Sequence, residues 1–154
     1  MSPDGSPVLT FEWDLSGEVT GSVVRHIGIL VFGTFYEYLP TGIIKTEILP
    51  GDFPPTPEGG TPSKAFGIEL GRTKLTESDF NDWVSSQTIN QFKAKNYNAA
   101  FNNCIFFAAK ACRFLGVHAP IRWTITASVI TGSFDISLPV VGIFGGGRRS
   151  MAQS

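Results

Sequence analysis

The change in hydrophobic periodicity along the chain is the strongest constraint on its fold. Between residues 9 and 39 the apolar residues alternate with polar ones or form short runs, which predicts strands at 9–15, 23–32 and 35–39. Helical spacing of apolar residues begins only after residue 75. Because strands come first and helices follow without alternating with them, the pattern is typical of an α+β domain, with an antiparallel sheet packed against a few helices.

The predicted sheet has a recognisable centre and a long interruption. The run VVRHIGILVF at 23–32 is apolar on both faces at its centre, which favours a central strand, and the short connection through Gly33 and Thr34 predicts a hairpin to 35–39. Segment 50–64 holds five prolines and three glycines, so we expect a flap over the surface, able to shape one wall of a groove, rather than a regular element. A strand pattern resumes at 65–70.

Two helices are predicted from their boundary signals. In the first, at 75–87, Thr76 stands three residues before Asp79 in the pattern of a capping box, and Phe80, Trp83 and Val84 share one face. Phe80 and Trp83, like Trp13 in the first strand, are interpreted as core, the alternative being that one of these aromatic residues lines a substrate groove.

The second helix lies within AAFNNCIFFAAKACRFLG, residues 99–116. Either Asn102 or Asn103 can cap its start and Gly116 can end it, which places Cys104 in the first turn. The apolar positions that recur at helical spacing are Ile105, Ala108, Ala109, Cys112 and Leu115.

Length and composition limit the classes of function. The 154 residues predict a single domain, 1–154, with a core at about 8–122 and a C-terminal tail at about 123–154. Twelve basic residues nearly balance thirteen acidic ones without forming a stripe, so no nucleic acid partner is expected. The apolar runs are far shorter than the roughly 20 residues of a membrane span, and the N-terminus lacks the features of a signal peptide.

The two cysteines indicate a reducing compartment. Eight residues apart on one helix, Cys104 and Cys112 are too distant for a disulfide, and together with His26 and His118 they supply no zinc pattern. We therefore expect no metal and no cofactor, and a cytoplasmic location with the nucleus as an alternative compartment.

Cys104 is the candidate nucleophile. The unpaired N–H groups and the positive end of the dipole at a helix start favour a thiolate, whereas Cys112 lies on the apolar stripe and is interpreted as core packing. A nucleophilic cysteine needs a base. His118 lies past the far end of the same helix, on the order of 20 Å away, so His26 is the predicted partner. The alternative is that Cys104 is a small buried residue and His26 a structural one.

The order of three stretches along the chain is informative: RHIGILVFG…YEYLPTGI, FGIELGRTKLTESDFNDWV and YNAAFNNCIFFAAKACRFLG. Together they resemble the PPPDE superfamily, whose best-known members are the DeSI desumoylating isopeptidases. The resemblance covers about residues 8–122. It implies a papain-like thiol-hydrolase fold, permuted so that the histidine precedes the cysteine, with the catalytic pair at His26 and Cys104. Arg25 stands where an aromatic residue often precedes the family's histidine, and Ile105 where a polar residue usually follows the cysteine.

The resemblance also implies an activity. It is that of a cysteine isopeptidase that removes ubiquitin or SUMO, or a thioester-linked acyl group, through a Cys–His dyad, with ubiquitin-like conjugates as partners. The backbone N–H of Cys104 is expected to meet the oxyanion, and Asn103 is a candidate for the second donor. The alternatives are a catalytically silent module that binds a ubiquitin-like protein or a peptide, and a thiol acyl-transfer enzyme similar to lecithin-retinol acyltransferase or the NlpC type. The sequence predicts neither the particular modifier nor the oligomeric state.

Overall fold

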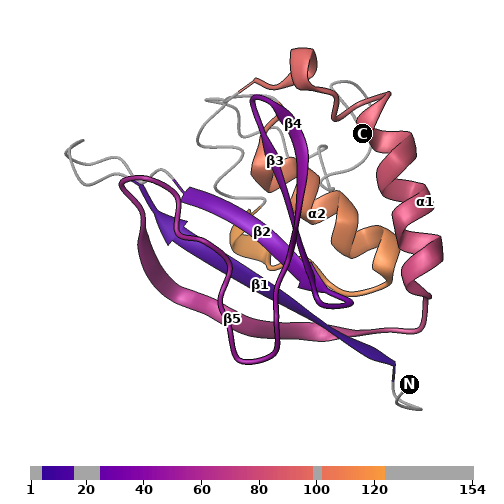
Figure 1. Ribbon diagram of the computed structural model, residues 1–154, viewed down its shortest axis with the longest axis horizontal. Coiled ribbons are helices and arrows are strands. Elements are labelled where there is room, and N and C mark those ends of the chain that lie inside the picture. The colour runs from indigo at the N-terminus through magenta and orange to yellow at the C-terminus, as the bar shows by residue number, and fades with distance from the viewer. Residues whose placement is uncertain (1–4, 16–24, 99–101, 124–154) are drawn as a thin grey trace.

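The computed structural model describes residues 5–15, 25–98 and 102–123. This part of the chain forms a five-stranded antiparallel sheet in the order β4-β3-β2-β1-β5, with helices packed against it (Figure 1). The strands are β1 (Ser6–Asp14), β2 (Arg25–Val31), β3 (Thr34–Leu39), β4 (Gly42–Glu47) and β5 (Thr61–Thr73). The helices are α1 (Glu77–Thr88), the 3₁₀ helix η1 (Ala94–Asn96) and α2 (Cys104–Leu115). The prediction of an α+β fold is confirmed.

The first three strands follow the predicted pattern, and β2 is the middle strand of the sheet. The hairpin between β2 and β3 turns at Phe32 and Gly33, one residue earlier than predicted, and both have positive φ, 56° and 72°. A two-residue turn of this hand matches the twist of the strands it joins. Strand β4 was not predicted, although it pairs with β3 along its whole length.

Strand β5 corrects the expectation for segment 50–64. The strand starts at Thr61, so the last four residues of that segment belong to the sheet and not to a flap. Pro62 is tolerated there because β5 is an edge strand, where a missing N–H need not break a ladder. Three register shifts against β1 bend this edge.

Both main helices begin at the predicted signals, and α2 also ends at the predicted glycine. Thr76 accepts a hydrogen bond from the Asp79 N–H, and the Asp79 carboxylate accepts one from the Thr76 N–H, which completes the predicted capping box. Asn103 caps α2, and Gly116 ends it in the left-handed conformation with φ 82°.

The two faces of the sheet carry different apolar clusters. The main core lies between the sheet and the helices, where Ile27 and Ile29 of β2, Phe80 of α1 and Phe107 of α2 are buried together. A smaller cluster on the other face consists of Phe11, Trp13 and Phe35. The predicted core positions Trp13 and Phe80 are confirmed, and Trp83 packs partly buried against the main core.

The chain beyond α2 returns to the sheet. Trp123 is buried in the main core, and the rest of the predicted tail lies outside the described residues. At the C-terminal end of β2, the start of segment 50–64 borders a surface groove beside the β2–β3 turn. Neither His26 nor Cys104 lines that groove, so it is separate from the site described next.

Candidate functional site

A gap in strand pairing creates the candidate site. The ladder between β2 and β3 joins only Ile29–Val31 to Thr34–Tyr36. Residues 25–28 still pair with β1, and 37–39 still pair with β4, but in the described part of the chain the two stretches do not pair with each other. The sheet is therefore open between β2 and β3 at the end where His26 lies, and the first turn of α2 meets it there.

The structure brings Cys104 and His26 together at this opening. Cys104 is the first residue of α2 and is only 4% exposed. Its thiol lies 3.7 Å from the carbonyl oxygen of Arg25, to which it can donate, and its interaction with His26 is one of the causes that raise the pKa of that imidazole. The Cys104 side chain therefore lies beside Arg25 and His26, the first two residues of β2.

His26 is held on several sides. Its Nε2 lies 2.6 Å from Glu37 Oε1 on β3. The Trp13 indole stacks on the imidazole with ring centroids 5.7 Å apart. Burial lowers the pKa of His26, but the hydrogen bonds and negative charges of Cys104 and Glu37 outweigh it and raise the pKa to about 9. At neutral pH the imidazolium form is favoured.

Glu37 is the residue that sequence reasoning missed. The sequence predicts a pair of residues, Cys104 and His26, without a third, yet the carboxylate of Glu37 contacts the histidine. One sequence feature could have identified Glu37: it is the only carboxylate in TFYEYL, a strand rich in aromatic residues that directly follows the strand of His26. A charged side chain in such a position needs a partner.

The asparagines before Cys104 have separate roles. The Oδ1 of Asn103 accepts hydrogen bonds from the N–H groups of Ile105 and Phe106, at 3.0 and 3.2 Å, and the N–H of Cys104 stays outside this cap. An oxyanion-binding role for Asn103 would therefore have to use its amide nitrogen. Asn102 binds elsewhere: its side chain contacts Gln91, the Asn96 carbonyl and the Tyr38 hydroxyl.

Tyr97 lies close to the first turn of α2. A two-residue backbone bridge joins Asn98 to Asn102, which brings the chain after η1 alongside the start of α2. Burial, followed by the negative charges of Cys104 and Tyr38, raises the pKa of Tyr97 to about 12. Its phenol therefore stays protonated near the thiol.

The other titratable candidates are not at the site. Cys112 is fully buried in the core, and burial, followed by the charge of Glu12, raises its pKa. Its interpretation as core packing is confirmed. His118 is exposed past the end of α2. Both cysteines are free, and the described residues contain no group of three or more side chains arranged to hold a metal ion.

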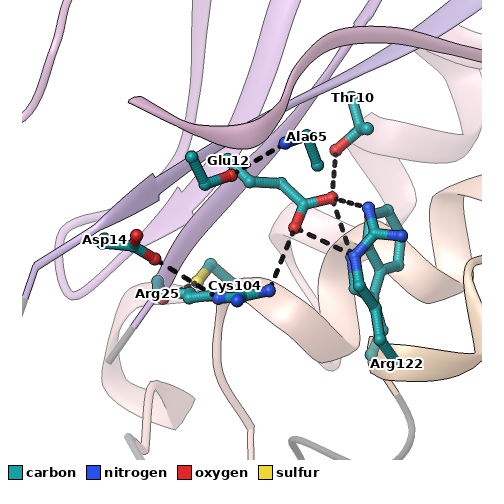
Figure 2. A network of polar contacts seen from close by, with 9 residues as sticks. Thr10, Glu12, Asp14, Arg25, Ala65, Cys104 and Arg122 are labelled. Carbon is teal, nitrogen blue, oxygen red and sulfur yellow. Dashed lines mark hydrogen bonds and ion pairs between the residues drawn. The ribbon is translucent and has the colours of Figure 1, made fainter. Parts of the chain in front are cut away.

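The buried carboxylate of Glu12 joins Arg25, at the start of β2, and Arg122, beyond α2, to strand β1 (Figure 2). Glu12 of β1 is fully buried and accepts hydrogen bonds from Thr10, from the Trp123 indole at 3.1 Å and from Arg122. Arg25 also approaches it, at 3.8 Å, and reaches Asp14 at 3.4 Å. The residue before His26 is thus fixed through ion pairs on β1.

An α+β fold whose cysteine and histidine meet where a helix begins is the arrangement of a peptidase-like protein. The chain matches the model of the "PPPDE putative peptidase domain" over residues 9–135 and belongs to this peptidase family. A comparison with curated protein sequences finds no match. Within the described residues, each helix is too short or too polar to cross a membrane.

Proposed function

We propose that the protein is a cysteine isopeptidase that cleaves ubiquitin or SUMO from conjugates by means of Cys104 and His26. The position of the Cys104 thiol beside Arg25 and His26 at the start of β2 is the observation that carries the proposal. Membership in a peptidase family supports the class of reaction. The environment that raises the pKa of His26 to about 9 supports an imidazolium at neutral pH, which can donate a proton to a leaving group.

The mechanism follows from these two groups. The Cys104 thiolate attacks the carbonyl carbon of the scissile bond, and a carbon–sulfur bond forms while the carbonyl oxygen takes up the negative charge. His26 then donates its proton to the leaving amine as the carbon–nitrogen bond breaks, which leaves a thioester on Cys104. Water attacks the thioester, His26 accepts the proton, and the carbon–sulfur bond breaks to restore the enzyme.

The start of α2 supplies the first oxyanion donor in this mechanism. The Asn103 side chain accepts from the N–H groups of Ile105 and Phe106, and we assign the N–H of Cys104, at the start of the same helix, as the donor to the oxyanion. The helix dipole adds a favourable field at the same place. Loss of one oxyanion donor commonly costs about 10²–10³ in rate.

The substrate class is supported by the low exposure of the reacting groups. Cys104 and His26 are 4% and 5% exposed, so a bulky side chain at the cleaved residue would meet the walls of the site. A chain that ends in two glycines, as ubiquitin and SUMO do, places no side chain beside the nucleophile. The same restriction fits the alternative of a thioester-linked acyl chain.

The test is covalent capture by ubiquitin and SUMO vinyl-sulfone probes. We expect a probe adduct on the wild-type protein, its loss in Cys104→Ala and its persistence in Cys112→Ala, which changes the buried thiol of the same helix. Adduct formation with both cysteine variants would contradict the proposed nucleophile.

A catalytically silent binding module is the second candidate. It is favoured by the contact of the Cys104 thiol with the Arg25 carbonyl, since a thiol that donates there is not poised as a thiolate. This function predicts no adduct with any ubiquitin-like probe, together with measurable noncovalent binding of ubiquitin or SUMO by calorimetry. Hydrolysis of an acyl thioester without probe capture would instead indicate an acyl-transfer enzyme.

A further inference from the structure

We infer that Glu37 is a positioning residue that holds His26 against Cys104 across the gap between β2 and β3, so that the reactive unit is a cysteine–histidine–glutamate triad. The inference rests on the proposed function and goes beyond its two residues. It starts from the unpaired ends of the two strands.

Glu37 spans the place where the sheet is open. The β2–β3 ladder ends at Ile29 and Tyr36, so no described backbone pair fixes His26 relative to β3. The bond from His26 Nε2 to Glu37 Oε1, at 2.6 Å, is the side-chain link that crosses this opening. Without this hydrogen bond, the imidazole would be positioned only by the pairing of β2 with β1 and by stacking on Trp13. The His26 side chain would then rotate more freely.

Glu37 lies on a strand that is paired along its whole length with its neighbour β4. Residues Thr34–Leu39 pair with Gly42–Glu47 through six consecutive positions, and Glu37 pairs with Ile44 in the middle of that ladder. Its side chain is 15% exposed, so solvent competes little for the carboxylate. A charge-assisted hydrogen bond in such surroundings is short and directional.

The contact also fixes which ring nitrogen serves the thiol. When Nε2 carries the hydrogen that Glu37 accepts, Nδ1 is the ring nitrogen that remains for proton exchange with Cys104. The titratable groups that act on His26 come from two elements, Cys104 of α2 and Glu37 of β3, while β1 contributes the uncharged Trp13. Arg25 and Asp14 nearby pair with each other.

The experiment compares Glu37→Gln and Glu37→Ala with Glu47→Gln, which changes an exposed glutamate of the adjacent strand β4. Iodoacetamide alkylation is followed as a function of pH, with the label located by peptide mapping. This readout requires no substrate. Hydrolysis of a ubiquitin or SUMO C-terminal amide and the NMR titration of His26 complete the set.

We expect Glu37→Gln to lower the alkylation rate of Cys104 at pH 6 roughly tenfold, the equivalent of about one pKa unit of lost imidazolium stabilisation. The alkaline limit of hydrolysis and the NMR titration of His26 should both move to lower pH. Glu37→Ala should in addition lower kcat about tenfold or more, because the ring loses its orientation. Glu47→Gln should match the wild type in every readout.

The outcomes separate this inference from the function it depends on. If both Glu37 variants keep the wild-type alkylation profile and the wild-type His26 titration, and only unfold more readily, Glu37 merely joins two strands and the inference is wrong. If His26→Ala also leaves the alkylation of Cys104 unchanged, the proposed cysteine–histidine pair fails as well.

Discussion

At the scale of single residues, two adjacent asparagines prepare the cysteine that follows them. Asn103 binds the backbone of the first helical turn, whereas Asn102 binds Gln91, Asn96 and Tyr38 and so fixes the preceding segment to the core. Cys104 therefore begins a helix whose first turn is capped by Asn103 and whose preceding segment is fixed by Asn102. A cysteine that served only as core packing would not require either contact, as Cys112 shows.

The cap gives a prediction for stability. Asn103→Ala removes the acceptor of two N–H groups and should lower the free energy of unfolding by about 1–2 kcal/mol, measured by urea denaturation. Asn103→Ser retains an oxygen that can cap and should lose only a few tenths of this amount. Equal losses for the two variants would show that the side chain acts by something other than capping.

Gly28 makes the closest approach within the sheet. A Cβ added there would lie 2.1 Å from Cζ of Phe35, so the aromatic ring of the neighbouring strand would have to move. We expect Gly28→Ala to destabilise the protein by about 1–3 kcal/mol in thermal unfolding. Phe35→Leu in the same chain should recover part of that loss, and strictly additive effects of the two substitutions would contradict the steric explanation.

At the scale of elements, the buried carboxylate of β1 joins three segments. Glu12 connects β1 to Arg25 at the start of β2 and to Arg122 and Trp123 beyond α2. Strands β1 and β2 are already paired through their backbones, whereas Arg122 and Trp123 are far from β1 in the sequence, so the carboxylate links the segment beyond α2 to the sheet. Since Arg25 also offers its carbonyl to Cys104, the network extends to the candidate site.

Removal of this carboxylate should be costly. Glu12→Ala leaves two guanidinium groups and an indole N–H without their shared acceptor, and we expect a loss of about 3–5 kcal/mol in the free energy of unfolding. Glu69→Ala is the matched control, because it breaks an exposed pair with Arg72 and should cost less than about 1 kcal/mol. Equal effects in chemical denaturation would show that burial of Glu12 contributes nothing.

The sequence predicted those elements whose signals are local. The Thr76 capping box, the Asn103 cap and Gly116 each act within four residues, and the structure has all of them. The pairing of Glu37 with His26 depends on where two strands separate, which no local pattern encodes. The same holds for the end of the proline-rich segment, since only the place of β5 at the sheet edge makes Pro62 acceptable in a strand.

At the scale of the whole molecule, the sheet separates two apolar clusters while the candidate site touches both. Cys104 belongs to the main core under the helices, and His26 stacks on Trp13 of the smaller cluster. The gap between β2 and β3 is where the two environments meet. Because folding raises the pKa of His26, the protonation of this residue is linked to the free energy of folding.

That link predicts a stability that falls as pH rises from about 6.5 to about 9. The folded protein holds the pKa of His26 at about 9, above its ordinary value of 6.5, so the native state binds more protons in this window than the unfolded state. The contribution is complete below pH 6.5 and lost as pH passes through 9. Urea unfolding at a series of pH values measures it.

His26→Gln should flatten this dependence between pH 6.5 and 9. Cys112, whose pKa is also raised above its ordinary value of 9.0, adds a decline only at higher pH, so the two contributions separate along the pH axis. Glu37→Gln should give an intermediate slope, since one of the groups that raise the pKa of His26 is lost while Cys104 remains. A wild-type stability that is constant from pH 6.5 to 9 would mean that His26 is not held as an imidazolium in the folded protein.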